Sequence, residues 1–164
     1  LNLEKEMKSV PITANGAERL KSQLNTYKTV ERQKIRKALE EARAHGDLKE
    51  NAEYHAAKEA QGILEAKIGM IEQQLQEATI IDLSKIPFSG KVVFGATVTL
   101  INIEDESEKT YQIVGEAESD IELGLISITS PIAQACIGQS AEDVVSVTTP
   151  KGVIEYEIKA IEIK

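Results

Sequence analysis

The sequence predicts an α+β protein with two parts: an N-terminal antiparallel α-helical coiled-coil hairpin over residues 1–83, and a C-terminal antiparallel-sheet domain with a short helix over residues 84–164. Two observations predict this class. Apolar residues recur at steps of three and four through the first half, which is the period of a helix. After about residue 87 the runs become short and alternate with a period of two, and Pro, Gly and Ser punctuate them.

The first helix is predicted to run from Thr13 to about Arg43. No Pro interrupts this stretch, and its apolar residues lie at positions 17, 20, 24, 27, 35, 38, 39 and 42. Thr13 is a suitable N-cap, and Gly46 is a suitable residue for the left-handed conformation just past a helix end. The stripe is narrow, as expected for a helix that packs along one seam.

A second helix is predicted from a stripe at positions 57, 60, 64, 68, 71, 75 and 78. Two helices of similar length joined by a few residues lie antiparallel, and each narrow stripe can be buried against the other. With roughly 30 residues per arm, the hairpin should be on the order of 45 Å long. Its tip is therefore far from the rest of the chain.

The second half is predicted to form a small sheet. Candidate strands are the runs 96–103, 110–115, 125–129, 144–149 and 153–163. The last run changes its alternation phase near Lys159, which indicates a bulge, and residues 149–152 form a turn that pairs the last two runs. Ser130 as N-cap, Pro131 in the first turn and Gly138 after the last turn predict one short helix.

Charge is unevenly distributed between the halves. The chain has 164 residues and a net charge of −8; residues 1–83 hold 13 Lys and Arg against 14 Asp and Glu, and residues 84–164 hold 6 against 13. An acidic second half argues against duplex nucleic-acid binding through that half, because phosphate affinity comes from Lys and Arg. The single Cys136 permits no intrachain disulfide, and no apolar stretch has the length of a signal or membrane segment, so we expect a soluble, cytoplasmic protein.

The break between the two helices carries a pair of acids, Asp47 and Glu50. One interpretation is structural: D-x-x-E ahead of a helix is a capping-box pattern. The other is functional, because two carboxylates one turn apart can share a Mg²⁺ ion, which prefers oxygen ligands and often takes only one or two from protein. Such a site would be weak alone and complete only when a partner supplies further ligands.

Basic residues and two histidines surround this pair. Arg43, Lys49 and Lys58 are typical of a solvated helix face, but at a carboxylate tip they would also let an acidic protein approach an RNA backbone. His45 and His55 have a spacing that fits no zinc motif. The sequence also contains no Ser/His/Asp arrangement and no Gly-rich phosphate loop, so nothing indicates a self-sufficient active site.

Five stretches resemble, in the same order, the bacterial Gre transcript-cleavage factors, closer to the A type than to the B type. They are "ITANGAERL", "EARAHGDLKENAEYHAAKE", "VVFGATVTL", "YQIVG" and "LISITSPIAQACIGQ". The resemblance covers residues 8–164 and implies a long coiled-coil hairpin followed by a domain similar to the FKBP fold. Both halves of the predicted architecture agree with it.

The resemblance also implies a partner and a role. A factor of this kind binds RNA polymerase at the rim of its secondary channel, and the hairpin reaches the active centre. There the tip acids help hold a second Mg²⁺ when the polymerase has backtracked, and the nascent RNA 3′ end is cleaved. The factor is then an accessory protein that supplies acidic residues, not an enzyme by itself.

On this sequence the resemblance makes Asp47 and Glu50 the catalytic and Mg²⁺-binding pair, and it places Arg43 and Lys58, with Lys49 between them, near RNA. The polymerase-docking segment comprises Ser130, Pro131, Ile132 and Ala133. Gln134 and Gln139 stand where the family often carries Arg and Lys, so less charge is available for docking.

Two other functions stay open from the sequence. A regulator of the same fold would occupy the polymerase channel without supporting cleavage, and the acidic pair argues against it. An FKBP-like isomerase or chaperone rests on fold analogy alone and would need an aromatic-lined pocket, whereas residues 84–164 contain only Phe88, Phe94, Tyr111 and Tyr156 as aromatics.

Overall fold

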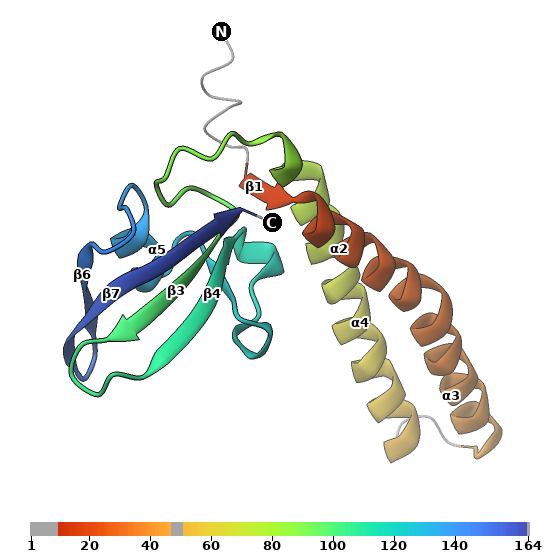
Figure 1. The fold of residues 1–164 in the computed structure, drawn as a ribbon. Helices are drawn as coiled ribbons and strands as arrows, with labels where there is room; N and C mark the ends of the chain where they lie inside the picture. The colour runs from red at the N-terminus through yellow and green to blue at the C-terminus, as the bar shows by residue number, and fades with distance from the viewer. Residues whose placement is uncertain (1–9, 47–50, 164) are drawn as a thin grey trace, which may run out of the picture. The chain divides into compact units, whose positions relative to one another are not determined.

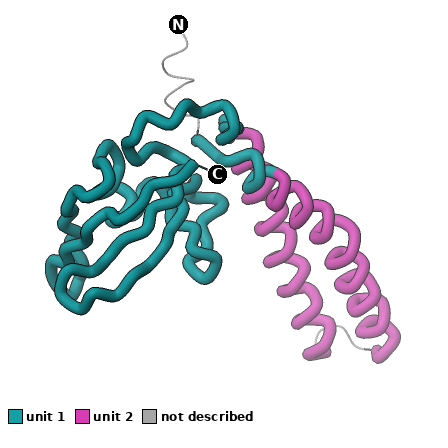
Figure 2. The backbone as a smooth tube through the Cα atoms, in the orientation of Figure 1, with its two compact units in different colours: residues 1–17, 78–164 teal, residues 18–77 magenta. Residues whose placement is uncertain are grey.

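The structure, a computed structural model, describes residues 10–46 and 51–163. The chain forms two compact units, one of residues 1–17 and 78–164 and the other of residues 18–77 (Figure 2). This division differs from the boundary expected between residues 83 and 84. The start of the first helix and the segment after the last hairpin helix belong with the sheet.

A two-stranded parallel sheet, which the sequence analysis missed, accounts for this division. Strand β1 (Val10–Thr13) pairs with β2 (Ala78–Ile81), so that Val10 lies opposite Ala78 and Thr13 opposite Ile81. Parallel strands need a long crossover connection, and here the whole helical hairpin is that connection (Figure 1). The hairpin therefore starts and ends at the same small sheet.

The hairpin has the predicted antiparallel arms (Figure 1). The first arm consists of α2 (Ala14–Thr26), a π-helical turn (Tyr27–Glu31) and α3 (Arg32–Ala44), and the second arm is α4 (Ala52–Glu77). Its buried apolar side chains come from the predicted stripes: Ala17, Leu20, Leu39, Ala42, Ala57, Leu64, Ile68 and Ile71. The 26 residues of α4 give that arm a length of about 39 Å.

The π-helical turn has a physical reason in the spacing of the first arm. Lys28 and Arg32, which are four residues apart at this turn, both reach acidic side chains of α4. Steps of four drift around an α-helix of 3.6 residues per turn. A π turn takes up an extra residue, which keeps these positions on the side that faces α4.

The second half contains a five-stranded sheet with the order β5-β4-β3-β7-β6. The strands are β3 (Ala96–Asn102), β4 (Glu108–Val114), β5 (Leu125–Ser127), β6 (Val144–Thr149) and β7 (Gly152–Ile163). The predicted strands are confirmed, but the sheet is not wholly antiparallel: β5 runs parallel to β4, with Ile113 opposite Ile126. The chain crosses over between these two strands through two short 3₁₀ turns, Glu116–Glu118 and Ile121–Leu123.

Local features of this unit agree with the sequence. The register of β3 against β7 shifts at Lys159, since Thr99 lies opposite Ala160 and Leu100 opposite Ile158. The bulge explains the change of alternation phase. At the 149–152 turn Thr149 pairs with Gly152, as predicted.

The globular core lies between the sheet and helix α5 (Pro131–Cys136). It includes the fully buried Leu100, Ile113 and Ile158, and Cys136 is also fully buried. Burial raises the pKa of the Cys136 thiol to about 11, so Cys136 packs as a small apolar residue. In the ranges 10–46 and 51–163, no helix combines the length and apolar character that a bilayer crossing requires.

Candidate functional site: the hairpin tip and the α5 surface

The first arm ends as the sequence predicts. The His45 N–H donates to Ala42 O at 3.2 Å and the Gly46 N–H to Arg43 O at 3.4 Å, which closes the last turn of α3. Gly46 has a φ of 110°, in the region that favours glycine. The chain thus leaves α3 directly before Asp47, Lys49 and Glu50, which lie outside the described residues.

The second arm begins at a cap that the sequence analysis missed. Asn51 Oδ1 accepts a hydrogen bond from the Tyr54 N–H at 3.1 Å, the geometry of an N-cap. Asn51 Nδ2 also donates to Ala42 O on α3 at 2.6 Å, so one side chain caps α4 and joins the two arms. The N-cap of α4 is thus Asn51 and α4 begins at Ala52, whereas Asp47 and Glu50, the predicted capping pair, lie outside the described residues.

Substitutions at Asn51 should separate these two roles. Asn51→Ala removes both bonds and is expected to destabilise the hairpin by about 1–2 kcal/mol. Asn51→Asp keeps a good N-cap acceptor but cannot donate to Ala42 O, so it should lose only part of this stability. Thermal unfolding followed by far-UV circular dichroism on the two variants would measure both effects. Equal losses for Ala and Asp would show that the cap contributes nothing.

Side chains on the described flanks of the tip are mostly exposed. Arg43 and Lys58 are both exposed, and Lys58 Nζ lies 3.3 Å from Gln61 Oε1. His45 Nε2 lies 3.8 Å from Glu53 Oε2. The predicted basic residues Arg43 and Lys58 thus remain accessible to solvent on the two arms.

Tyr54 and the two histidines show no metal-binding arrangement. The rings of Tyr54 and His55 meet edge to face, with their centroids 5.8 Å apart. Within the two described ranges, His, Cys, Asp and Glu side chains do not gather into any group of three that could hold a metal ion.

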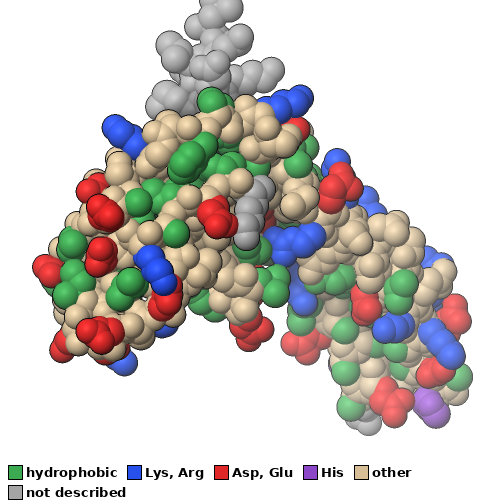
Figure 3. All heavy atoms as spheres, in the orientation of Figure 1, with side chains coloured by type: hydrophobic (Ala, Val, Ile, Leu, Met, Phe, Trp, Pro, Cys, Tyr) green, Lys and Arg blue, Asp and Glu red, His purple; other side chains and the backbone are tan. Residues whose placement is uncertain are grey.

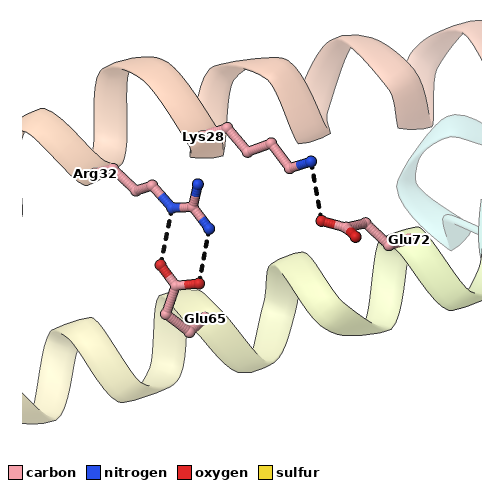
Figure 4. A network of polar contacts seen from close by, with 4 residues as sticks. All are labelled: Lys28, Arg32, Glu65 and Glu72. Atoms are coloured by element: carbon pink, nitrogen blue, oxygen red, sulfur yellow. Dashed lines mark hydrogen bonds and ion pairs between the residues drawn. The ribbon is translucent and has the colours of Figure 1, made fainter.

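Two ion pairs hold the arms together farther from the tip (Figure 4). Arg32 makes a bidentate contact with Glu65, with Nε–Oε1 and Nη2–Oε2 distances of 2.8 Å, and Lys28 Nζ lies 3.0 Å from Glu72 Oε1. The hydrogen bond from Arg32 lowers the pKa of Glu65. Both cations sit in or beside the π-helical turn, and the Arg32–Glu65 pair lines a depression of about 250 Å³ along the hairpin.

The predicted docking segment forms α5 and its cap, but its four residues are not equally accessible. Ser130 Oγ accepts the Ala133 N–H at 3.2 Å, so Ser130 is the predicted N-cap. Ala133 is fully buried and Ile132 packs partly against the core, whereas Pro131 is exposed. Gln134, which is also exposed, donates from Nε2 to Ile128 O at 2.6 Å. Of the four predicted residues, Pro131 has the most accessible side chain.

The visible face of the molecule shows the difference in charge between the units (Figure 3). Acidic and basic side chains are interspersed over the hairpin, whereas acidic ones predominate on the globular unit. The hairpin therefore offers more basic side chains than the globular unit for contact with an anion such as a phosphate.

Two protein-family profiles match the chain. The profile described as "Transcription elongation factor, N-terminal" matches residues 10–80, and "Transcription elongation factor, GreA/GreB, C-term" matches residues 87–163. The chain belongs to the GreA/GreB family of transcription elongation factors. The resemblance found in the five sequence stretches is thus confirmed over nearly the whole chain.

Individual GreA proteins are similar over almost their full length. The transcription elongation factor GreA of Psychromonas ingrahamii is 53% identical, and the match covers 95% of this chain and 98% of that protein. The GreA of Haemophilus influenzae is 55% identical, and the match covers 93% of this chain and 96% of that protein. Among solved structures, GreA factor homolog 1 (Gfh1) of Thermus thermophilus is 32% identical, covers 94% of this chain and 99% of its own, and has a TM-score of 0.41. These GreA relatives show that the chain is a GreA-type transcription elongation factor.

Proposed function

We propose that this elongation factor stimulates endonucleolytic cleavage of the nascent RNA 3′ end in backtracked RNA polymerase. The factor binds at the secondary-channel rim and delivers Asp47 and Glu50 to the polymerase active centre. It acts as an accessory protein, and the polymerase supplies the rest of the reacting site. Membership of the GreA/GreB family, combined with an acidic pair at the turn of a long hairpin, is the observation that supports this proposal.

The local structure supports a functional use of the pair. Because Asn51 supplies the cap of α4 and Gly46 ends α3, neither helix needs a carboxylate from positions 47 or 50. Polar residues that a fold does not require for its own hydrogen bonds are free to serve a ligand. The cap at Asn51 therefore supports the functional interpretation of Asp47 and Glu50 over the capping one.

The donor set fits Mg²⁺. Asp47 and Glu50 offer hard carboxylate oxygens, and two such ligands leave most of an octahedral shell for water, RNA and the partner. Bound Mg²⁺ would increase the nucleophilicity of a water and stabilise charge on the leaving oxygen. Arg43, Lys49 and Lys58 would reduce repulsion between the acids and the RNA phosphates.

The decisive experiment adds the factor to a stalled, backtracked elongation complex with Mg²⁺. Short RNA fragments from the 3′ end are expected, and free RNA incubated with the factor alone should stay intact. Polymerase binding without fragments would favour the channel-occupying regulator. Hydrolysis of free RNA would contradict a site shared with polymerase. Proline-isomerase activity has no support from the family profiles, which describe both halves as parts of an elongation factor.

Docking through α5 can be tested separately with Pro131→Asp. This variant places a charge on the exposed first turn of α5, and it should weaken polymerase binding about tenfold or more because charge enters an apolar contact. The helix should survive, since Asp is favourable in a first turn. Polymerase affinity can be measured by competition with labelled wild-type factor.

The matched control is Leu123→Asp, which introduces the same charge at a side chain that is 63% exposed in a different turn of the same unit. Ile132→Asp is less informative because Ile132 also packs against the core. Unchanged affinity for Pro131→Asp, or an equal loss for Leu123→Asp, would show that docking does not use α5.

A further inference from the structure

A buried carboxylate lies where the first hairpin arm begins. Glu118 is only 6% exposed, and Thr13, which caps α2, is 4% exposed. Glu118 Oε2 accepts the Thr13 N–H at 2.7 Å and the Gly115 N–H at 3.1 Å, while Glu118 Oε1 accepts the Thr13 hydroxyl. Thr13 Oγ1 in turn accepts the Gly16 N–H at 3.0 Å. One side chain thus connects two segments that are about a hundred residues apart in sequence.

Two glycines make room for this contact. A Cβ atom on Gly16 would lie 2.1 Å from Glu118 Oε1, and one on Gly115 would lie 2.3 Å from Pro11 O. Both distances are far below contact, so any larger residue would push the carboxylate or the strand away. The close approach of β1 and of the first turn of α2 to the Gly115–Glu118 segment therefore depends on Gly at both positions.

Simple stability does not explain why a carboxylate is used here. A buried ionised group is costly unless hydrogen bonds compensate it, and apolar residues of similar volume often stabilise a protein equally well. Three directed hydrogen bonds, in contrast, fix the positions of the groups that they join. Here they fix Thr13 and the first turn of α2, and α2 continues into the hairpin.

We propose that Glu118 is a positioning residue that fastens the root of the first hairpin arm, meaning Thr13 and the first turn of α2, to the globular unit. By holding Thr13 and the first turn of α2, it limits the range of directions that the arm takes. The tip acids then reach the RNA in a reproducible place. The predicted effect of Glu118 on cleavage rests on the proposed function, whereas its predicted effect on the direction of the arm does not.

The first measurement is structural and uses the free factor. Spin labels at Lys37→Cys on α3 and Lys151→Cys in the β6–β7 turn, both exposed positions, report the distribution of distances between the units by pulsed EPR. Glu118→Ala should roughly double the width of this distribution, since the root is no longer held. Glu118→Gln can still accept both backbone N–H groups and should stay close to wild type.

The matched control is Glu116→Ala, which removes the same charge from an exposed residue of the same turn. If Glu118→Ala fails to fold, Thr13→Val removes one donor while Thr13→Ser keeps it, and only the Val variant should broaden the distribution. An unchanged width in the folded variants that lack the contact would overturn the proposal. Equal broadening in Glu116→Ala would overturn it as well.

The second measurement is kinetic. In backtracked complexes saturated with factor, Glu118→Ala should lower the cleavage rate about tenfold, because small misplacement of reacting groups is costly. The factor concentration for half-maximal cleavage should hardly change, since docking is elsewhere. If wild-type factor supports no cleavage, the proposed function fails, while the EPR widths still decide the role of Glu118. A broader EPR distance distribution in Glu118→Ala with an unchanged cleavage rate at saturating factor would show that Glu118 has only a structural role, and it would contradict the proposal that Glu118 positions the tip acids.

Discussion

Replacing Asp47 by Asn, or Glu50 by Gln, is expected to lower RNA cleavage on the order of 100-fold while polymerase binding stays at the wild-type level. Each amide is close in size to the acid that it replaces but carries no charge, so it is a much poorer Mg²⁺ ligand. Higher Mg²⁺ should restore the rate only partly. Fragment formation from a labelled RNA 3′ end, measured in complexes saturated with the factor, gives the rate.

The same substitutions should leave the helices intact. The cap of α4 is Asn51 and the end of α3 is fixed by Gly46, so circular dichroism melts should match the wild type. Glu59→Gln, which removes a carboxylate from an exposed position farther along α4, is the matched control and should keep full activity. Wild-type cleavage by both amide variants would mean that the factor occupies the channel without supplying ligands.

The hairpin tip illustrates where sequence reasoning stops. Asp and Asn are equally good N-caps, but only Asp47, and not Asn51, was considered from the sequence as the cap of the second helix. In the structure Asn51 Oδ1 accepts the cap bond from the Tyr54 N–H, and Asn51 also makes a second bond, from its NH₂ group to Ala42 O, which a carboxylate could not donate. That bond joins the two arms, and it becomes visible only when the arms are placed side by side.

Local chemistry explains the features that were predicted well. The cap at Ser130, the bulge at Lys159 and the glycine at Gly46 each depend on residues within a few positions in the sequence. Pairing direction and distant contacts depend on tertiary structure. The sequence of the three-residue strand β5 does not indicate that it pairs in parallel. Strand β2 was missed because its first residue, Ala78, fits the periodicity of the preceding helical stripe.

Glu118 is the clearest case of a misleading local context. It lies in the acidic run "GEAESDIE", which is typical of a solvated loop. In the fold it is buried because Thr13, from the other end of the chain, supplies two donors. No periodic pattern contains that information.

A core substitution should affect the globular unit far more than the hairpin. Leu100 is fully buried on the central strand β3, and Leu100→Ala is expected to destabilise that unit by about 3–5 kcal/mol. Amide hydrogen exchange should accelerate by more than about 100-fold in β3 and β7, since each 1.4 kcal/mol is tenfold. Amides of α3 and α4 should keep their protection, because residues 18–77 form a unit with its own buried stripe.

Leu123→Ala is the control for this substitution. It makes the same chemical change at a side chain that is 63% exposed, so stability should stay within about 0.5 kcal/mol of wild type. If exchange accelerates equally in both units of Leu100→Ala, the chain unfolds as one cooperative body and the hairpin depends on the sheet. If only the globular unit responds, mild heating should release the variant from polymerase while its hairpin remains helical, because the proposed docking surface on α5 is lost with that unit.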